Sequence, residues 1–308
     1  LAAQRHGLVG EIVGCARKPE TRAKAEDLGI CARSTADPAE AVQGADLVMI
    51  CTPVGAYAEI AAMMQPALAP GAIVSDVGSV KQATIRDVGP YLPDGVHFVP
   101  GHPVAGTEKS GPEAGFAELF EQRWTILTPP PGTDTRAVER VTRLWTGCGA
   151  MVEEMDAGHH DRVLAMTSHL PHLIAYTIVS TAADLEPGEM REVVKFSAGG
   201  FRDFTRIAAS DPIMWRDIFL NNRDAVLEVL QRFNEDITAL QRAIRWGEGE
   251  FLEDRFRRTR ELRQEVVQAQ QAGSFDPREP AASPQTPAER ALAGQAAPAP
   301  GTPGPRGS

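Results

Sequence analysis

The chain has 308 residues, of which 23% are charged, and a formal net charge of −10 at pH 7. This length suffices for two domains with separate hydrophobic cores. The acidic balance argues against nucleic acid and anionic membranes as partners, because both would repel the chain. Four scattered cysteines without a CxxC pair predict a reduced, cytoplasmic protein without a metal knuckle. No apolar run approaches the roughly 20 residues of a membrane-spanning helix.

The first residues have the pattern of the second half of a helix that ends at Gly7. A predicted strand at residues 11–15 follows immediately. Because a domain does not normally begin inside a helix, we expect that a strand and its loop upstream of Leu1 are missing.

Short apolar strands alternate with helices over the first part of the chain. The predicted strands are residues 11–15, 47–51, 73–76, 97–100 and 124–127, and the predicted helices are 19–28, 38–42, 56–65 and 83–88. Short apolar strands between helices indicate a parallel sheet that is buried on both faces. Residues 1–134 are therefore predicted to form an α/β Rossmann-like, doubly wound domain.

Residues 135–270 are different in character. A helix at 136–146 and a strand at 151–154 are followed by an almost continuous helical pattern from 157 to 269. A long amphipathic helical domain often buries its apolar face against another subunit, so we expect a homodimer. The alternative is that this face packs within its own chain. Residues 271–308 are rich in Pro, Ala, Gly, Ser and Thr and are predicted to be a disordered tail.

The dinucleotide fingerprint G-x-G-x-x-G, which follows the first strand of a Rossmann domain, is absent. At the end of the strand at 11–15, Ala16 or Arg17 occupies the place of the acid that binds the ribose of NAD. The missing acid and the cations nearby slightly favour NADP, whose extra phosphate attracts positive charge. The alternative is that Arg17 faces solvent, so the cofactor is predicted to be NAD or NADP.

Two turns follow apolar strands at the edge where ligands bind in this fold. Thr52 and Pro53 follow the strand at 47–51, and Asp76, Gly78 and Ser79 lie at the end of the strand at 73–76 and in the turn after it. Small residues here let the backbone approach a cofactor. These five residues are predicted to bind it.

His102 stands between Gly101 and Pro103 at the end of a predicted strand. An imidazole fixed in this way can take up a proton near neutral pH and act as a general base. The alternative is a turn histidine that is hydrogen-bonded to the backbone.

The helical part opens with two histidines and an acid at 159–161, followed by the sequence AMTSHLPH at 165–172. On a continuous helix Asp161, Ala165, Ser168 and His172 share one face, which places Ser168 and His172 side by side. No nucleophile elbow accompanies them, and no set of carboxylates or cysteines supports a metal. We therefore predict no metal site.

A glycine pair that ends at Gly200 leads into a segment with two arginines, Arg202 and Arg206, and with Asp203. Arginine is the preferred partner of a carboxylate because its fork binds both oxygens. The alternatives are a surface Arg–Asp pair and, for the downstream Trp215, a place in the core.

Together these segments resemble the prephenate/arogenate dehydrogenase family. The motifs that carry the resemblance are DVGSVK at 76–81, GHPVAGTE at 101–108, MTSHLPH at 166–172 and GFRDFTR at 200–206. Their order and spacing match over nearly all of residues 1 to about 265. The resemblance implies oxidative decarboxylation of prephenate or arogenate, with hydride transfer to NAD(P), in tyrosine biosynthesis.

The resemblance also implies roles for single residues. His102 would accept the proton of the substrate hydroxyl, and Ser79 would orient that hydroxyl and His102. Arg206 would bind a substrate carboxylate. The remaining residues expected to line the substrate pocket or lie near it are Ser168, His172, Gly200, Asp203 and Trp215. The chain departs from the family in lacking the glycine loop and in carrying Ala16 in place of the acid.

Two other interpretations remain open from the sequence. A 3-hydroxyacid dehydrogenase has a similar architecture and uses a helical lysine, but Lys195 lacks an Asn partner at helical spacing. A chain without its phosphate loop is alternatively an inactive fragment or a dimerisation module. Neither the choice between prephenate and arogenate nor feedback inhibition by tyrosine follows from the sequence.

Overall fold

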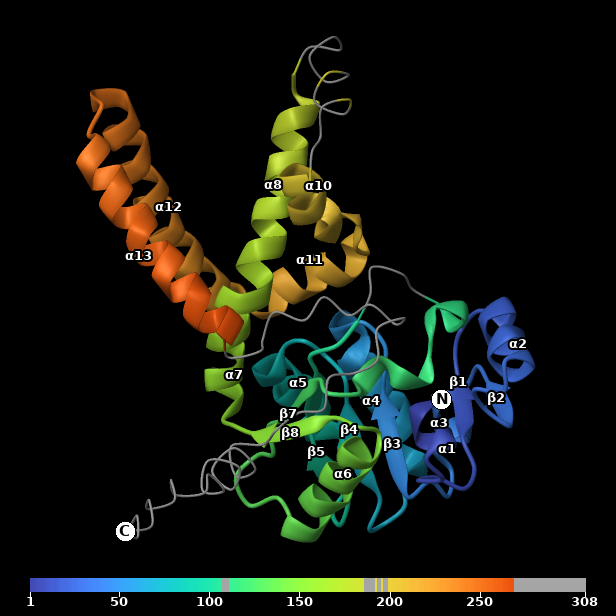
Figure 1. The fold of residues 1–308 in the computed structure, drawn as a ribbon. Helices are drawn as coiled ribbons and strands as arrows, with labels where there is room; N and C mark the ends of the chain where they lie inside the picture. The colour runs from blue at the N-terminus through green and yellow to red at the C-terminus, as the bar shows by residue number, and fades with distance from the viewer. Residues whose placement is uncertain (107–110, 186–191, 193–194, 196–198, 269–308) are drawn as a thin grey trace, which may run out of the picture. The chain divides into compact units, whose positions relative to one another are not determined.

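The computed structural model describes residues 1–106, 111–185, 192, 195 and 199–268 (Figure 1). The tail predicted at 271–308 lies outside the described residues, as do Thr107 and Glu108 of the second motif.

The first strands form two parallel sheets. β1 (Val13–Cys15) pairs with β2 (Arg33–Thr35). β3 (Leu47–Ile50), β4 (Ile73–Asp76) and β5 (His97–Val99) pair in that order, with Leu47 opposite Ile73 and Ile73 opposite His97. Their carboxyl ends therefore meet at one edge, where the sequence predicted the cofactor turns.

A third sheet contains β6, which the sequence analysis missed, as it missed β2. β6 (Gly101–Pro103) pairs antiparallel with β7 (Trp124–Leu127), which pairs parallel with β8 (Met151–Glu154). Pro103 is tolerated because β6 is an edge strand, where a missing N–H costs no ladder hydrogen bond. His102 therefore lies within a strand and not in a turn. The sheet also continues to Glu154, beyond the boundary expected at residue 134.

Helices cover both faces of these sheets, as the apolar strands predicted. They are α1 (Ala2–Arg5), α2 (Pro19–Asp27), α3 (Pro38–Val42), α4 (Tyr57–Met64), α5 (Lys81–Val88) and α6 (Thr135–Gly147). The start of α6 is fixed locally, because the side chain of Asp134 accepts a hydrogen bond from the backbone of Arg136.

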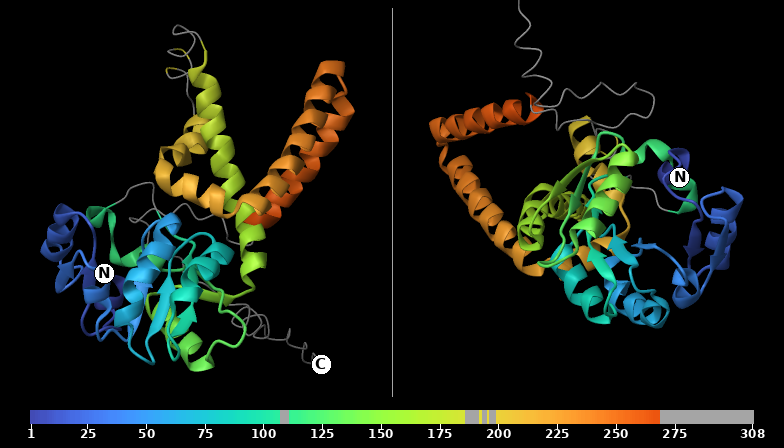
Figure 2. Two further views of the ribbon diagram at one scale, coloured as in Figure 1. Left: turned by 180° about the vertical axis from the view of Figure 1, so that it is seen from behind. Right: turned by 90° about the horizontal axis from the view of Figure 1, so that it is seen from below.

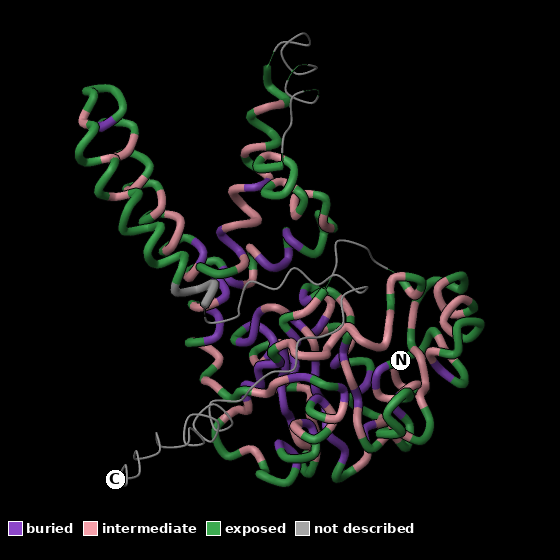
Figure 3. Tube along the Cα trace, in the orientation of Figure 1, coloured by how far each residue is buried: buried purple, intermediate pink, exposed green. Residues whose placement is uncertain are grey.

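β4 shows how the two faces are filled, because every residue in it is buried. Val74 packs in one apolar cluster with Tyr57 of α4 and Val80 before α5, whereas Ile73 packs in a second cluster with Val141 of α6. Side chains of successive strand residues point to opposite faces, so a wholly apolar strand requires a helix layer on each side. Figure 3 shows these strands as largely buried.

The rest of the described chain is helical. Its elements are α7 (Ala157–Leu164), the π-helix η6 (Ala165–His169), α8 (Leu170–Ala183), α10 (Gly199–Thr205), η7 (Arg206–Ala209), α11 (Pro212–Asn221), α12 (Arg223–Trp246) and α13 (Gly249–Gln268). α12 ends at Gly247, whose left-handed φ of 67° lets the chain reverse into α13. The two helices meet at this turn, and the right-hand view of Figure 2 shows them diverging from it.

The continuous helical stretch Ala157–Ala183 is long and apolar enough to cross a membrane, by length and composition alone. This differs from the expectation that no apolar run approaches such a length. The core helix of a soluble protein passes the same test. Here His160, Asp161 and His169 are buried within the stretch and hydrogen-bonded to neighbouring elements, as in a core helix.

Candidate active site

His102 lies at the centre of a buried polar cluster between the sheet and the first helix of the helical part. Its side chain is 7% exposed, and its Nδ1 is 2.8 Å from Nε2 of His160 in α7. The two rings meet edge to face. On the far side of its ring, His160 places Nδ1 2.8 Å from Oδ1 of Asp161. Two adjacent residues of α7 are therefore connected to a strand of the sheet domain.

Asp161 also connects α7 to α5. Its two carboxylate oxygens accept hydrogen bonds from the backbone N–H groups of Lys81, at 2.7 Å, and Gln82, at 2.9 Å. These groups belong to the first turn of α5, which has unsatisfied donors and a partial positive charge. A carboxylate from another part of the chain therefore caps this helix.

A buried ion pair holds the strand that carries His102. Nζ of Lys81 lies 2.5 Å from Oδ2 of Asp76 and 2.6 Å from the carbonyl oxygen of Gly101, which it donates to. Asp76 accepts three further hydrogen bonds, from Gly101 N at 3.0 Å, Gly78 N at 2.7 Å and the Tyr57 hydroxyl at 3.1 Å. This buried carboxylate therefore joins the end of β4 to α4, to α5 and to the start of β6.

The π-helix η6 turns a further histidine inward. Pro171 in the first turn of α8 has no N–H to donate to the preceding turn, and π-turns often mark functional sites. His169 is fully buried, with Nδ1 3.0 Å from the side-chain amide of Asn222. That amide also donates to the carbonyl of Asp161, at 2.9 Å.

His172 and Trp215, which are both expected to lie at or near the substrate pocket, stack on each other. Their rings are stacked with centroids 3.7 Å apart, and the His172 Nδ1 is 2.9 Å from the Ser168 carbonyl oxygen. Ser168 therefore meets His172 through its backbone and not through its hydroxyl, because η6 interrupts the continuous helix assumed from the sequence. Trp215 is buried and belongs to the core cluster of the sheet domain, which confirms the interpretation as a core residue, and its place near the substrate stays a prediction.

The other residues predicted to bind substrate lie on α10 and η7. Gly200 and Asp203 are exposed on α10, and Arg206 is exposed at the start of η7. Arg206 lies close enough to His172 for its charge to act on that ring. Lys195, considered for a 3-hydroxyacid dehydrogenase, is exposed, whereas the buried lysine is Lys81.

The predicted cofactor residues lie at the carboxyl ends of the strands. The hydroxyl of Thr52 is buried without a hydrogen-bond partner within the described chain, next to the exposed Pro53. A Cβ at Gly78 would stand 2.8 Å from the Tyr57 hydroxyl, so the backbone comes very close there. An unpartnered polar atom and a close backbone approach fit a bound polar ligand such as a dinucleotide. Ser79 is half-buried in the turn after Gly78, and Arg17 is exposed after β1.

Burial controls the protonation of the cluster. It lowers the pKa of His102 well below its usual range, and the nearby His160, Lys81 and His169 lower it further. Burial likewise lowers the pKa of His160, against the opposing effect of Asp161, and lowers that of His169 to about 4. Burial lowers the pKa of His172, and Arg206 also contributes. At neutral pH His102 is therefore an uncharged imidazole, able to accept a proton.

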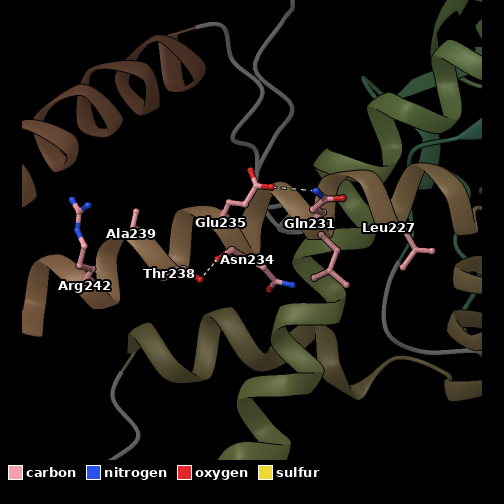
Figure 4. Close-up of a pocket in the computed structure, with 8 residues that line it drawn as sticks. Leu227, Gln231, Asn234, Glu235, Thr238, Ala239 and Arg242 are labelled. Atoms are coloured by element: carbon pink, nitrogen blue, oxygen red, sulfur yellow. Dashed lines mark hydrogen bonds between the residues drawn. The ribbon is translucent and has the colours of Figure 1, made fainter.

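A separate groove of about 710 Å³ runs along α12 and contains none of these residues (Figure 4). It is lined by Leu227, Leu230, Gln231, Asn234, Glu235, Thr238, Ala239 and Arg242. Its polar groups bond along their own helix, as Gln231 does to Glu235. Polar groups that converge on a ligand are found around His102 instead, so we assign the chemistry to that cluster.

Comparison with known proteins matches both parts of the chain. Residues 1–154 match the model of the prephenate dehydrogenase nucleotide-binding domain, and residues 156–258 match that of the prephenate dehydrogenase dimerization domain. The chain belongs to the prephenate dehydrogenase family. The two models meet after β8, in agreement with the sheet that continues to Glu154.

Individual relatives agree with this assignment. Cyclohexadienyl dehydrogenase of Zymomonas mobilis is 43% identical over 242 residues, which are 79% of this chain and 82% of that protein. Prephenate dehydrogenase of Bacillus subtilis is 38% identical over 263 residues, 83% and 68% of the two chains. The structure of Aquifex aeolicus prephenate dehydrogenase in complex with hydroxyphenyl propionate and NAD+ is 39% identical, with a TM-score of 0.78 over 86% of this chain and 92% of that one.

The family assignment confirms several predictions. The protein is an NAD(P)-dependent oxidoreductase with a Rossmann-like domain followed by a helical domain. It also decides against the 3-hydroxyacid dehydrogenase considered from the sequence.

Sequence reasoning did not assign a role to several residues of the cluster, namely Tyr57, Lys81, His160, Asp161, His169 and Asn222. Lys81 and His169 stood inside the quoted motifs, and a lysine or histidine in a run of apolar neighbours was the available signal. Tyr57 and Asn222 gave no signal, because only the folded chain brings them to the cluster.

Proposed function

We propose that this enzyme oxidatively decarboxylates a cyclohexadienyl acid, prephenate or arogenate or both, with His102 as the general base. The observation that carries the proposal is a buried, uncharged imidazole beside the carboxyl ends of β4 and β6, held by a polar cluster on its Nδ1 side. The names of the relatives, which include a cyclohexadienyl dehydrogenase and two prephenate dehydrogenases, support the substrate class.

The reaction requires a base that takes up a proton in one step and returns it in a later step. Bound NAD(P) supplies the hydride acceptor. His102 takes the hydroxyl proton of the substrate as the C–H electron pair leaves the same carbon and the C–O bond becomes a carbonyl. Loss of CO2 from the opposite ring carbon returns its bonding pair to the ring, which becomes a phenolate. The phenolate oxygen takes the proton back from His102, so no net proton is released.

Orientation of the substrate is assigned to the helical part and to the turn after β4. The substrate carries two carboxylates, and Arg206 would provide donors for one of them. His172, whose Nδ1–H donates to the Ser168 carbonyl, would line the pocket with the ring that stacks on Trp215. Ser79 lies in the turn between Asp76 and α5 and would orient the hydroxyl toward His102. Because aromatisation drives the reaction, holding these groups in place accounts for most of the rate that the protein must provide.

The cofactor is assigned to the carboxyl edge of the first sheets. Thr52, Pro53, Gly78 and Ser79 would line the nicotinamide end, and Arg17 after β1 would lie near the ribose. The exposed Arg17 in place of an acid favours NADP slightly. Turnover rates for the four pairs of substrate and cofactor decide both open preferences, prephenate against arogenate and NAD against NADP.

Formation of NAD(P)H by the full-length protein tests the proposal directly. Prephenate and arogenate are each supplied with NAD and with NADP, and the same assay is run on His102→Asn and on His97→Asn, a half-buried histidine of β5. We expect turnover by the wild type, a loss on the order of 10²–10⁴-fold in kcat for His102→Asn, and little change for His97→Asn. Full turnover by His102→Asn would refute the role of His102, and no turnover in any of the four assays would refute the substrate class.

We further propose that the enzyme is a homodimer formed through its helical part. Large apolar side chains stand exposed on α12, among them Ile244 at 68% and Trp246 at 73%, and the groove of Figure 4 lies on the same helix. Exposed apolar patches of this kind usually mark an interface. The matched family model over residues 156–258 is described as a dimerization domain, which supports the same conclusion.

Sedimentation at micromolar concentration tests the dimer. An Ile244→Arg/Trp246→Arg double variant is expected to sediment as a monomer, and Leu28→Arg, at an exposed leucine of the sheet domain, as a dimer like the wild type. A monomeric wild type, or a double variant that stays dimeric, would contradict the assignment of the interface to the end of α12.

We also propose a cytoplasmic location. Cys15, Cys31, Cys51 and Cys148 are all free, which supports a reducing compartment and is consistent with the predicted cytoplasmic location. Fractionation of the source cells with the protein followed by immunoblotting tests it, and a membrane or secreted fraction would contradict it.

A further inference from the structure

The hydrogen bonds around His102 have only one consistent set of directions. The carboxylate of Asp161 accepts from two backbone N–H groups and has no proton to give. Nδ1 of His160 must therefore donate to it across the 2.8 Å contact. The other ring nitrogen of a neutral His160 then carries a lone pair, so it accepts from Nδ1 of His102.

This order of donors fixes the tautomer of His102. With its proton on Nδ1, the ring presents a lone pair at Nε2, the nitrogen that takes up the substrate proton. The opposite tautomer would place a proton at Nε2, where it could not accept one. It would also bring two lone pairs together between His102 and His160, at 2.8 Å.

We propose that His160 and Asp161 are a positioning relay that locks His102 in its basic tautomer and stabilises the imidazolium formed during the reaction. The inference rests on the proposed role of His102 as the base. When Nε2 gains the proton, Nδ1–H of the cation donates to His160, whose far side is hydrogen-bonded to a carboxylate. A charge in a buried site is stabilised only by dipoles and ions already in place.

The start of α7 sets the orientation of the two relay residues. Asp156 caps the helix by accepting from the backbone of His159, and this sets the rotation that turns His160 and Asp161 inward. Asp161 then occupies the first turn of α5, where the helix dipole favours a negative charge. Asp161, at the far end of the relay, is thus held by backbone N–H groups of α5, whereas its own helix is α7.

The groups that surround His102 come from four elements besides β6. They are His160 and Asp161 on α7, Lys81 on α5, its partner Asp76 on β4, and His169 on η6. Lys81 and His169 oppose protonation of His102, as a charged His160 would, whereas a neutral His160 accepts from Nδ1–H of the imidazolium and donates to the carboxylate of Asp161. Loss of the relay is therefore expected to disfavour the imidazolium and to free the ring to adopt the opposite tautomer.

Three variants separate a relay from a structural role. His160→Leu removes the acceptor, His160→Gln keeps a carbonyl that can accept from Nδ1–H, and His159→Leu changes the adjacent exposed histidine as a control. We expect kcat to fall on the order of 100-fold for His160→Leu and to recover at least about tenfold in His160→Gln. We also expect KM for substrate and the dissociation constant of NADH, followed by fluorescence, to stay within about threefold for all three, since none of them touches a ligand.

The tautomer is observed without any turnover. Nitrogen NMR of protein labelled at histidine, with the His102 signals identified by their loss in His102→Asn, reports which ring nitrogen carries the proton. We expect Nδ1–H in the wild type and an increased share of Nε2–H in His160→Leu. A wild-type His102 protonated at Nε2 would overturn the relay, and this test holds even if His160→Leu fails to fold.

The outcomes distinguish this inference from the proposed function. Full kcat in a folded His160→Leu, with His102→Asn inactive, would overturn the relay and leave the proposed function standing. A wild type locked with Nδ1–H that turns over none of the four substrate and cofactor pairs would support the lock while refuting the proposed function.

Discussion

Replacement of Lys81 by Met is expected to destabilise the protein far more than the loss of an ordinary ion pair. The ammonium of Lys81 lies 2.5 Å from Asp76, and both side chains are 0% exposed. Removing one member of a buried pair leaves an uncompensated charge, at a cost of about 3–5 kcal/mol. Asp76 keeps three hydrogen-bond donors after the change, so we expect the lower end, about 3 kcal/mol.

A surface pair of similar geometry provides the control. Arg257 lies 2.6 Å from Asp254, with side chains 58% and 54% exposed. Water and salt screen this pair, and Arg257→Met is expected to cost about 0.5 kcal/mol or less. The contrast between two contacts of nearly equal length measures the effect of burial alone.

Urea unfolding followed by circular dichroism, with calorimetry for Tm, gives both free energies. The double variant Lys81→Met/Asp76→Asn should recover part of the loss, because it leaves no unpaired charge behind. Equal costs for Lys81→Met and Arg257→Met, or a cost below about 1 kcal/mol for Lys81→Met, would refute the argument from burial.

Three further changes follow from the same structure. The pKa of His169 is about 4 in the folded protein and near 6.5 in the unfolded chain, so the unfolded chain binds more protons below pH 6.5. This residue should therefore cost the protein about 2 kcal/mol of stability between pH 7 and pH 5. In urea titrations His169→Gln should show a smaller loss over the same pH range. Gly78→Ala would place a Cβ 2.8 Å from the Tyr57 hydroxyl and should cost about 1–3 kcal/mol, whereas an unchanged Tm would show that the turn has room. Asp211→Ala removes the cap that accepts from the first N–H groups of α11 at 2.8 and 2.9 Å and should cost about 1–2 kcal/mol in urea unfolding, with a change below about 0.3 kcal/mol counting against it.

Much of the sheet domain was predicted because its signals are local. The runs at 73–76 and 124–127 became strands with the predicted bounds, and the helix at 38–42 begins after a capping Asp37. Four-residue apolar runs between helices admit few other structures in a soluble chain. By contrast, a strand at β6 is not expected from a sequence that contains Pro103, because proline has no N–H for a ladder hydrogen bond. The strand forms because β6 lies at the edge of its sheet.

The helical part was predicted in type but not in geometry. A continuous α-helix from Asp161 to His172 would have aligned Ser168 with His172, and the π-helix η6 changed the rotation midway. It buried His169 in place of Ser168 and moved the contact of His172 to a backbone carbonyl. Hydropathy at helical spacing cannot distinguish the two, because a π-turn shifts the phase without altering composition.

The sequence by itself determined the family and the α/β and helical halves, and it singled out His102 as the candidate base, because each of these depends on residue type at short spacing. Only the tertiary structure decided which residues lie on the Nδ1 side of His102. His160 and Asp161 lie 58 and 80 residues along the chain from the groups they contact, His102 and Lys81. Partners at such separations are set by how helices and strands pack, and burial then makes their charges and hydrogen bonds decisive.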